Sequence, residues 1–588
     1  MDAGRLSITF TEGCAQLAEA YHEPMAQGPV IISDKSTIQT LTVDESVLLD
    51  NFYMSNIVPV FFAECLADLE RDMVRAKSKG SPESLVGALA TRTPDSKACG
   101  NMFHMRLLEG ELMGKFDLSQ VHFRPVRSRG EPVMTGDSKG VLFRQSEEEE
   151  AVRRWTERDF LDLERQIAKQ WRRMIERIDL NAMSGNVLSS IGPWRKPTSL
   201  EDAKLLTDTI VDCIDQEWLL RLGLRTLNLA EATDWIVNRW ITDRRKPLRT
   251  YLPYFVHVLS INIFFALVLP INLLSKVKPS HAIDLAYLYY LPFCTVFTSR
   301  DNFHVQVAPL FMDTFQTFVH GDELKEDLGR LHETYQRLSQ EELDKGLIGF
   351  ADCPPQDTSF LTTRLWDKYL PKWREPRQSF TDMPNDILQA IDQMAKKVMG
   401  ASPTEAHGEH DVDKLDFVTV SKKVSPKKGS YLRFSKETIL KIHEDEQNTT
   451  RESDSESMQV HLPGTAFASL SDRLAEINHD PKCSNLEVYF LSNKLDQNGN
   501  KVVEDSMWAA EICSFAIRVF NQETQAALKQ EFERSPVISI LALWTRYGAG
   551  KLGILRLKPA PEDPVQVADK YDDWEGKAIG AYLHRHNL

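Results

Sequence analysis

The spacing of apolar residues in the first 76 positions predicts one buried strand and two helices. Residues 29–33 (PVIIS) form a compact apolar run, typical of a buried strand, that ends at Asp34. A helical spacing follows from about residue 43 to 53. Residues 59–76 (PVFFAECLADLERDMVRA) begin with proline, which favours a first helical turn, and then repeat apolar residues at helical intervals.

A long middle section follows, in which helical patterns dominate after an irregular start. Residues 77–146 are rich in Gly, Ser, Pro and Arg, whereas residues 145–180 form one long amphipathic pattern with an acidic start and a basic end, which suits a helix dipole. Residues 283–298 (IDLAYLYYLPFCTVFT) indicate a helix that gives way to a strand. Further helices are expected at 199–216, 228–243, 305–345 and 384–399.

The C-terminal third is divided by two polar stretches that are typical of linkers, residues 400–413 and 443–458. Between them, DFVTVSKKVSPKKGSYLRF predicts a hairpin with a basic turn, and residues beyond 460 alternate between helical and strand patterns. The resulting units are 1–76 and 251–320 as two halves of one core, 77–250 as a mainly helical insertion, 321–399 as a helical extension, 400–458 as a linker with a basic hairpin, and 459–588 as a C-terminal α/β domain.

One apolar segment raises the question of a membrane. Residues 250–275 (TYLPYFVHVLSINIFFALVLPINLLS) contain no Lys, Arg, Asp or Glu and are long enough for a spanning helix. Two prolines, His257 and two asparagines interrupt the segment. We expect a buried helix instead, and we keep a membrane-anchored protein as a third interpretation.

Composition narrows the function classes only slightly. The 588 residues are 42% hydrophobic and 26% charged, which is ordinary for globular proteins. A net charge of −15 argues against a surface that is basic throughout, although it leaves room for a local basic groove. The 8 cysteines include no CxxC pair, so a zinc ribbon or disulfide framework is not expected, and neither a secretory signal nor an oxidising compartment is indicated. We expect a cytoplasmic protein.

Four carboxylates stand where a solvated charge has no structural reason to be. Asp34 follows the apolar strand, Glu64 interrupts the apolar run PVFFAECL, Asp284 opens the apolar helix DLAYLYYL, and Asp301 follows TVFTS. Hydrolysis of a phosphodiester without a nucleophilic side chain uses divalent ions, and Mg²⁺ and Mn²⁺ prefer several converging carboxylates. Each position also has an ordinary interpretation: Asp34 as a cap, Glu64 as half of an ion pair with an arginine, Asp284 as a helix N-terminal charge, and Asp301 as a turn residue.

The same segments resemble a known nuclease family. VIISDKS resembles the first strand of a PIN domain, with its acid and small polar residue, and VPVFFAECLADL resembles its second acid on a helix. DLAYLYYLPFCTVFTSRDNF resembles the closing segment, where an acid on a helix precedes a strand that ends in Thr and then Asp. The resemblance implies an α/β fold: a PIN-like parallel-sheet core, here split by a large helical insertion and followed by a separate small C-terminal α/β domain.

The resemblance also implies an activity. A PIN-like core would hydrolyse RNA or, less favoured, DNA, with one or two Mg²⁺ or Mn²⁺ ions bound by Asp34, Glu64, Asp284 and Asp301. Ser36, Asn302 and His304 are expected next to this site or against substrate. The alternative is a catalytically silent PIN-like scaffold whose insertion or C-terminal domain binds protein or nucleic acid. Candidate phosphate contacts, which could equally form a solvated hairpin, are Lys422, Lys423, Lys427, Lys428 and Arg433.

Overall fold

The structure is a computed structural model of the whole chain. It describes residues 6–12, 28–71, 80–375 and 417–440, with short gaps between residues 115 and 278, and five C-terminal strands, 487–488, 494–495, 501–502, 539–546 and 549–556. The architecture of these residues is mixed α/β, as expected from the sequence.

A parallel sheet of five strands forms the centre of the molecule. Its members are β2 (Val30–Ser33), β3 (Met54–Ile57), β4 (Cys99–Gly100), β7 (Val296–Ser299) and β8 (Thr317–His320). They lie in the order β4-β3-β2-β7-β8, and every neighbouring pair is parallel. The strand pattern at residues 29–33 and the strand after the helix at 283 are therefore confirmed, and the two predicted halves of the core share one sheet.

The middle of this sheet is a topological switch point. Strand β2 pairs with β3 on one side and with β7, from the far side of the insertion, on the other. In open parallel sheets the carboxyl ends of such strands leave a crevice in which ligands bind. Asp34 follows β2 directly, and Arg300 and Asp301 follow β7, so the first and last predicted carboxylates lie at this point.

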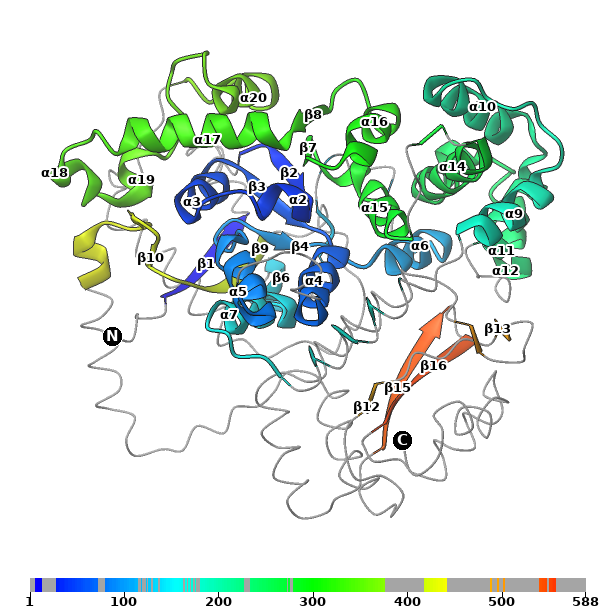
Figure 1. Ribbon diagram of the computed structural model, residues 1–588, viewed down its shortest axis with the longest axis horizontal. Helices are drawn as coiled ribbons and strands as arrows, with labels where there is room; N and C mark the ends of the chain where they lie inside the picture. Colours follow the sequence, from blue (N-terminus) through cyan, green and yellow to red (C-terminus); the bar gives the residue numbers. More distant parts are fainter. Residues whose placement is uncertain are drawn as a thin grey trace.

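Short helices start from the carboxyl ends of the strands and cover the sheet (Figure 1). Their starts follow local sequence signals: Asp34 caps α2, Thr42 and Glu45 form a capping box at α3, and Pro59 opens α4. The core helices are α2 (Lys35–Ile38), α3 (Val43–Phe52), α4 (Pro59–Leu66), η1 (Ala67–Glu70), α15 (His281–Leu288), η4 (Leu291–Phe293) and α16 (Asn302–Phe311).

The insertion is more regular at its start than the sequence pattern predicts. Residues expected to be irregular contain α5 (Pro82–Arg92), α6 (His104–Leu112) and a hairpin of β5 (Glu131–Thr135) and β6 (Ser138–Arg144). The expected boundary at residue 76 is also wrong, because β4 lies beyond it and pairs with β3 of the core. Two residues are too few for a strand to leave a periodic pattern.

The long helix predicted for residues 145–180 is interrupted. Its first part, α7, spans Glu147–Thr156 and starts with a capping box at Ser146. Arg158 then adopts a left-handed backbone (φ 61°), which ends the helix. Arg154 makes a buried ion pair of 2.7 Å with Glu164, so the chain turns back on itself at this point.

The other helices of the insertion are grouped around α14, which spans Pro253–Val268 (right side of Figure 1). Helix α14 therefore packs with the insertion, although residues 251–320 were predicted as the second half of the core. This helix and η3 (Leu269–Ile271) are long and apolar enough to cross a membrane, but 78% of the apolar window is buried inside the protein. Glu111 of α6 caps its start by accepting hydrogen bonds from the backbone N–H groups of Tyr254 and Phe255. Helix α14 contacts α9 (Leu180–Ile191), α10 (Leu200–Cys213) and α13 (Leu248–Tyr251). Helix α11 (Gln216–Thr226) approaches it closely at Gly223, and α12 (Thr233–Thr242) contacts α11.

The predicted basic hairpin belongs to a second sheet instead of standing free in a linker. Strand β9 (Phe417–Val424) pairs antiparallel with β1 (Leu6–Glu12) and parallel with β6, giving the order β1-β9-β6-β5. The turn that follows, between β10 (Lys427–Lys428) and β11 (Tyr431–Leu432), lies against α3. At Gly429 (φ +59°) an added Cβ would lie 2.3 Å from Asp44 Oδ1, so the turn requires glycine there.

The chain after the core, predicted as a helical extension at residues 321–399, is mainly helical where the structure describes it, but the helix predicted for residues 305–345 is wrong in part because β8 interrupts it. The extension contains α17 (Gly321–Tyr335), α18 (Gln340–Leu343), α19 (Gly346–Phe350) and α20 (Leu361–Tyr369), whereas the helix expected at 384–399 lies outside the described residues. In the C-terminal part, β12 (Glu487–Val488), β16 (Ala549–Arg556) and β15 (Ser539–Arg546) form an antiparallel sheet, and β13 (Lys494–Leu495) pairs with β14 (Lys501–Val502). A separate C-terminal domain stays a prediction.

Candidate functional site

Asp34, at the carboxyl edge of the sheet, is fixed by several hydrogen bonds to its backbone and side chain. Its backbone N–H donates to Thr298 O of β7, and its side chain accepts from the Thr37 backbone N–H at 2.9 Å. The hydroxyl of Ser36 lies 2.8 Å from both carboxylate oxygens, and that of Ser299 lies 2.5 Å from Oδ2. Burial alone would raise the pKa of Asp34, but its hydrogen bonds and the charge of His304 lower it.

His304, on α16, is the partner of Asp34 inside the protein. Nδ1 lies 3.3 Å from Asp34 Oδ2, and Nε2 lies 2.8 Å from the backbone oxygen of Asp284. Nδ1 also lies 3.0 Å from Ser299 Oγ, whose own proton is donated to Asp34. Asp34 Oδ2 and the backbone oxygen of Asp284 only accept hydrogen bonds, which favours a ring that is protonated at both nitrogens. Burial would lower the pKa of His304, but Asp34 and Asp284 raise it to about 9. A ring with both nitrogens engaged and 1% exposure positions Asp34 and has no free nitrogen for a substrate.

Glu64, on α4, lies on the other side of Asp34. Its Oε2 accepts a hydrogen bond of 2.8 Å from the hydroxyl of Tyr287, on α15. Its Oε1 lies 4.0 Å from Nζ of Lys35, and Lys35 also donates to the backbone oxygen of Glu64 at 2.9 Å. Burial raises the pKa of Glu64, while Lys35 and Tyr287 oppose that rise. The alternative interpretation of Glu64 as a paired carboxylate thus holds in part, with lysine in place of the expected arginine.

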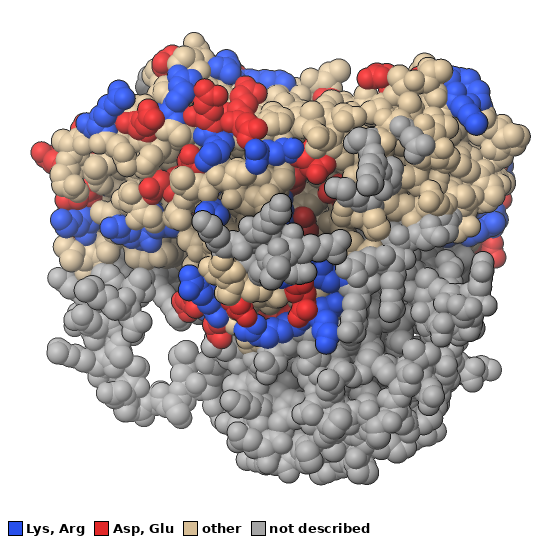
Figure 2. All heavy atoms as spheres, in the orientation of Figure 1, with Lys and Arg blue, Asp and Glu red and all other residues tan. Residues whose placement is uncertain are grey.

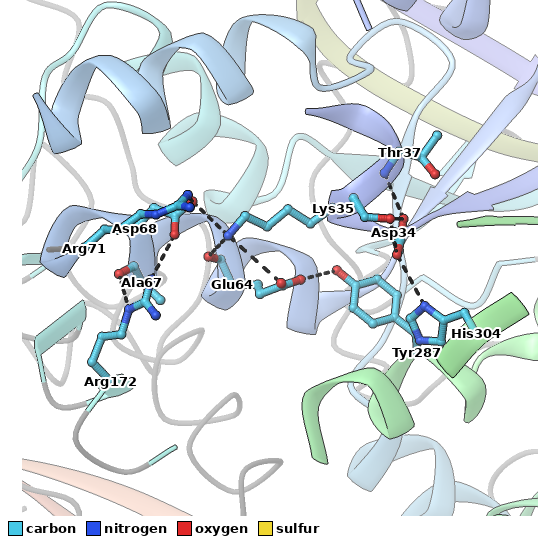
Figure 3. Close-up of polar contacts among 11 residues, drawn as sticks. Asp34, Lys35, Thr37, Glu64, Ala67, Asp68, Arg71, Arg172, Tyr287 and His304 are labelled. Carbon is cyan, nitrogen blue, oxygen red and sulfur yellow. Dashed lines mark hydrogen bonds and ion pairs between the residues drawn. The ribbon is translucent and has the colours of Figure 1, made fainter. Parts of the chain in front are cut away.

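Asp68, one turn beyond Glu64, is fully paired with cations. Lys35 Nζ lies 2.9 Å from Oδ2, and Arg172 of the insertion lies 3.0 Å from Oδ1. Arg172 also donates to the backbone oxygen of Ala67, so the insertion is anchored directly to η1 of the core. Figure 3 shows this row of contacts from Arg172 through Asp68, Lys35 and Glu64 to Tyr287, beside the Asp34–His304 pair.

Asp284 differs from these carboxylates because its side chain makes no hydrogen bond or ion pair with another described residue. It lies in the first turn of α15 and is partly buried. Burial raises the pKa of Asp284 to about 8, with a further contribution from the charges of Asp301, Glu64 and Asp34, while His304 opposes it. A carboxylate in such a place needs a proton or a cation.

The last two predicted positions lie at the start of α16. Asp301 accepts a hydrogen bond of 2.8 Å from the Phe303 backbone N–H and therefore caps the helix, as one of its alternative interpretations states. Asn302 is exposed.

Ser36, besides binding Asp34, accepts a hydrogen bond of 2.9 Å from the Arg300 backbone N–H and so joins the ends of β2 and β7.

The four predicted carboxylates therefore gather at one edge of the sheet, since Asp34, Glu64 and Asp301 all act on the pKa of Asp284. Figure 2 shows acidic side chains in a recess near the middle of this face. Among the residues that the structure describes, however, no three His, Cys, Asp or Glu side chains are arranged so that they could hold an ion. The donors suit a divalent cation chemically, because they are carboxylate oxygens with an excess of negative charge at Asp284.

The sequence argument missed Ser299, whose hydroxyl binds Asp34, and two further contributing residues, Lys35 and Tyr287. Lys35 stands directly after Asp34 in SDKS, and Tyr287 stands one turn after Asp284 in DLAYLYY. A lysine inside an apolar strand–helix junction was a usable signal, because a buried ammonium requires an acidic partner. Tyr287 gave no signal, since a tyrosine in an apolar helix is ordinary core.

The predicted phosphate contacts in the second sheet mostly make contacts within the protein. Lys422 is buried and forms a 2.8 Å ion pair with Glu149, and Arg433 is buried between Asp50 and Asp95. Lys428 donates to the backbone oxygen of Thr93. These three are occupied by structural contacts in this conformation, so they are corrected as phosphate contacts. Lys427 is exposed, and the side chain of Lys423 lies outside the described residues.

Comparison of the chain with family models, with curated proteins and with solved structures gives no match.

Proposed function

We propose that this chain has a PIN-like core and is a divalent-metal-dependent nuclease, with RNA as the favoured substrate and DNA as the second. The carboxylates that would hold Mg²⁺ or Mn²⁺ are Asp34, Glu64, Asp284 and Asp301. When bound, such a cation would activate water and neutralise charge on the leaving oxygen. The observation that carries the proposal is Asp284: a partly buried carboxylate without a hydrogen-bond or ion-pair partner among the described residues, next to three other carboxylates at a topological switch point.

The surrounding residues would keep this site in place. The hydroxyls of Ser36 and Ser299 and the His304 ring fix both oxygens of Asp34, and Ser36 also ties β2 to β7. The exposed Asn302 is the residue at the start of α16 that a substrate could reach. On the face in Figure 2, described Lys and Arg side chains are mixed with Asp and Glu, so a phosphate backbone would be guided by local cations only.

The test is cleavage of labelled single-stranded RNA and DNA by the full chain with EDTA, Mg²⁺ or Mn²⁺. We expect cleavage that needs the ion and is lost in Asp284→Asn. A matched control is Asp327→Asn, since Asp327 is also a buried carboxylate but lies between α17 and α20, where its oxygens accept hydrogen bonds from residues 361 and 362. Where the control folds, its cleavage should be retained. Equal cleavage by wild type and Asp284→Asn would contradict the proposal.

A second candidate function, the catalytically silent scaffold, is favoured by one specific observation. Lys35 and His304 already supply positive charge to Glu64 and Asp34, and no set of three ligands is preformed among the described residues. A scaffold of this kind would bind a protein or nucleic-acid partner without hydrolysing it. Binding of RNA without cleavage, in the presence of Mn²⁺ and with no ion bound to the protein, would support this second function.

A further inference from the structure

Two tryptophans are exposed on neighbouring helices of the insertion. Trp218 of α11 is 40% exposed, Trp235 of α12 is 49% exposed, and Ile241 of α12 is 37% exposed. Helices α11 and α12 contact each other, so these side chains form one group and are not isolated apolar residues. Several large apolar side chains that stay in contact with water are typical of a surface that binds another molecule.

Ion pairs show how the two helices are arranged. Nη1 of Arg221, on α11, lies 3.0 Å from Oδ1 of Asp234, in the first turn of α12. Nη2 of Arg245, just beyond the end of α12, lies 3.5 Å from Oε2 of Glu217, in the first turn of α11. The helices therefore run antiparallel. Each tryptophan directly follows the acidic residue of its own helix, so the two rings stand at opposite ends of the pair.

Both helices turn their tryptophan outward. Trp218, Arg221 and Arg225 recur at intervals of three and four residues, which places them on one face of α11. Leu219 and Leu220, on the other side of that helix, are buried. Helix α12 follows the same pattern, with an exposed tryptophan and a buried opposite side. The two helices thus share an outer face.

Three exposed cations on or directly after these helices have no ion pair among the described residues: Arg225, Arg244 and Lys246. Arg244 and Arg245 also adopt left-handed backbones (φ 64° and 50°), which are uncommon for residues with a bulky side chain. The whole chain has a net charge of −15. This part of the insertion therefore combines exposed aromatic rings with positive charge that the described contacts leave unneutralised.

This combination suits a single-stranded nucleic acid. Unpaired bases stack on tryptophan, and guanidinium groups donate hydrogen bonds to phosphate oxygens. A lipid surface fits less well, because insertion into a bilayer interface uses a continuous apolar face. Here the ion-paired Glu217, Arg221 and Asp234 interrupt that face. Charge and aromatic content together favour a strand with unpaired bases.

We propose that the outer face of α11 and α12 binds single-stranded RNA, at a place separate from the carboxylates of the sheet edge. Figure 1 shows these helices at the right-hand side of the molecule, away from β2 and β7. Trp218 and Trp235 stack on bases, and the unpaired cations contact phosphates. The inference rests on the proposed function for the choice of RNA, and it adds a second contact that holds the strand.

The experiment is binding of fluorescein-labelled oligouridine to the full chain, measured by fluorescence anisotropy in EDTA so that ion-dependent cleavage does not occur. We expect Trp218→Ala/Trp235→Ala to bind at least about tenfold more weakly, because stacking on two rings is lost. Trp218→Phe/Trp235→Phe keeps two aromatic faces and should retain most of the affinity. A matched control, Leu205→Ala/Leu440→Ala, removes two other exposed apolar side chains and should bind like wild type.

A second variant tests the charges. Arg225→Gln/Arg244→Gln/Lys246→Gln should weaken binding and make it less sensitive to salt, because fewer counterions are released from the phosphates. This variant decides if the alanine double variant does not fold by circular dichroism. Unchanged affinity and unchanged salt dependence would then overturn the inference.

The outcomes separate this inference from the proposed function. Wild-type affinity in a folded Trp218→Ala/Trp235→Ala protein would overturn the inference while the nuclease proposal stands. So would binding to phosphatidylserine vesicles that needs both tryptophans while RNA binding does not, which would assign the face to a lipid surface. Conversely, RNA binding that depends on both tryptophans, without ion-dependent cleavage, would overturn the nuclease and leave the inference standing.

Discussion

Two buried regions of this protein each contain an aspartate, and the two side chains differ in their hydrogen bonding. Between α17 and α20, Asp327 accepts hydrogen bonds from the backbone N–H groups of Leu361 and Thr362 and from the Thr362 hydroxyl, at 2.6–2.9 Å. At the carboxyl edge of the sheet, the Asp284 side chain accepts no hydrogen bond from any residue in the described part of the chain and borders three other carboxylates. The Asp327 carboxylate stabilises the fold through its hydrogen bonds. The Asp284 carboxylate destabilises the fold when it is ionised, and a bound cation would remove this destabilisation.

The largest effect on stability is therefore expected at Asp327, not at the proposed site. Asp327→Ala would leave two buried N–H groups without acceptors, at a cost of roughly 3 kcal/mol in the free energy of unfolding. Chemical denaturation of the metal-free chain measures this cost. If Asp327→Ala has the same denaturation midpoint as wild type, the Asp327 carboxylate does not stabilise the fold, and the contrast with Asp284 is wrong.

For Asp284→Asn we expect a gain in the free energy of unfolding instead of a loss, and the size of this gain depends on pH. The folded-state pKa of about 8 lies above the ordinary value of 3.8, so the unfolded chain releases this proton first and wild-type stability falls as pH rises from about 4 to about 8. Asp284→Asn removes this loss. In EDTA, the variant should be more stable than wild type at pH 8 by on the order of 2 kcal/mol, and the gap should close toward pH 5. A gap that stays constant over this range would contradict the assignment.

A smaller effect distinguishes the two roles of Asp301. Asp301→Ser keeps a side chain that can cap α16, so the free energy of unfolding should change by less than about 0.5 kcal/mol, whereas Asp301→Ala should cost about 1 kcal/mol. Both variants lose the carboxylate, and both should bind Mn²⁺ more weakly in calorimetry. Wild-type affinity in Asp301→Ser would reduce Asp301 to a helix cap.

The smallest change in stability is expected at Asn302, which is exposed at the start of α16. Asn302→Ala should leave the melting temperature within error, because exposed substitutions away from special features change stability by less than about 0.5 kcal/mol. Cleavage of RNA should nevertheless weaken several-fold if this residue touches substrate. Unchanged cleavage would remove Asn302 from the site.

Local patterns in the sequence were enough to predict the two middle strands of the sheet, β2 and β7, and the carboxylates beside them. An apolar run that ends in Asp, as at Ile31–Asp34, reports burial and charge at the same place, and both are local properties. The same holds for Asp284 and Asp301, on either side of β7. The structure places these groups at one edge because parallel strands direct their carboxyl ends to the same side.

What the sequence could not predict depends on pairing across long distances in the chain. Lys422 of β9 meets Glu149 of α7, and Arg433 meets Asp50 of α3, so residues read as a basic hairpin are interior ion pairs. Strand β4 has only two residues and is recognised only by its register with β3. The ion pairs of Asp68 are a further example, because Arg172, which pairs with it, comes from the distant insertion.

The central claim is that the carboxylates at the edge of the sheet require a divalent cation, and Asp284 tests it most directly. The measurement is the melting temperature of wild type and Asp284→Asn at pH 7.5, each in EDTA and in saturating Mn²⁺. A ligand at about 100 times its dissociation constant stabilises the folded state by roughly 2.7 kcal/mol, so wild type should melt several degrees higher with the ion. Asp284→Asn should show little or no rise. No rise in wild type, or an equal rise in both proteins, would contradict the account.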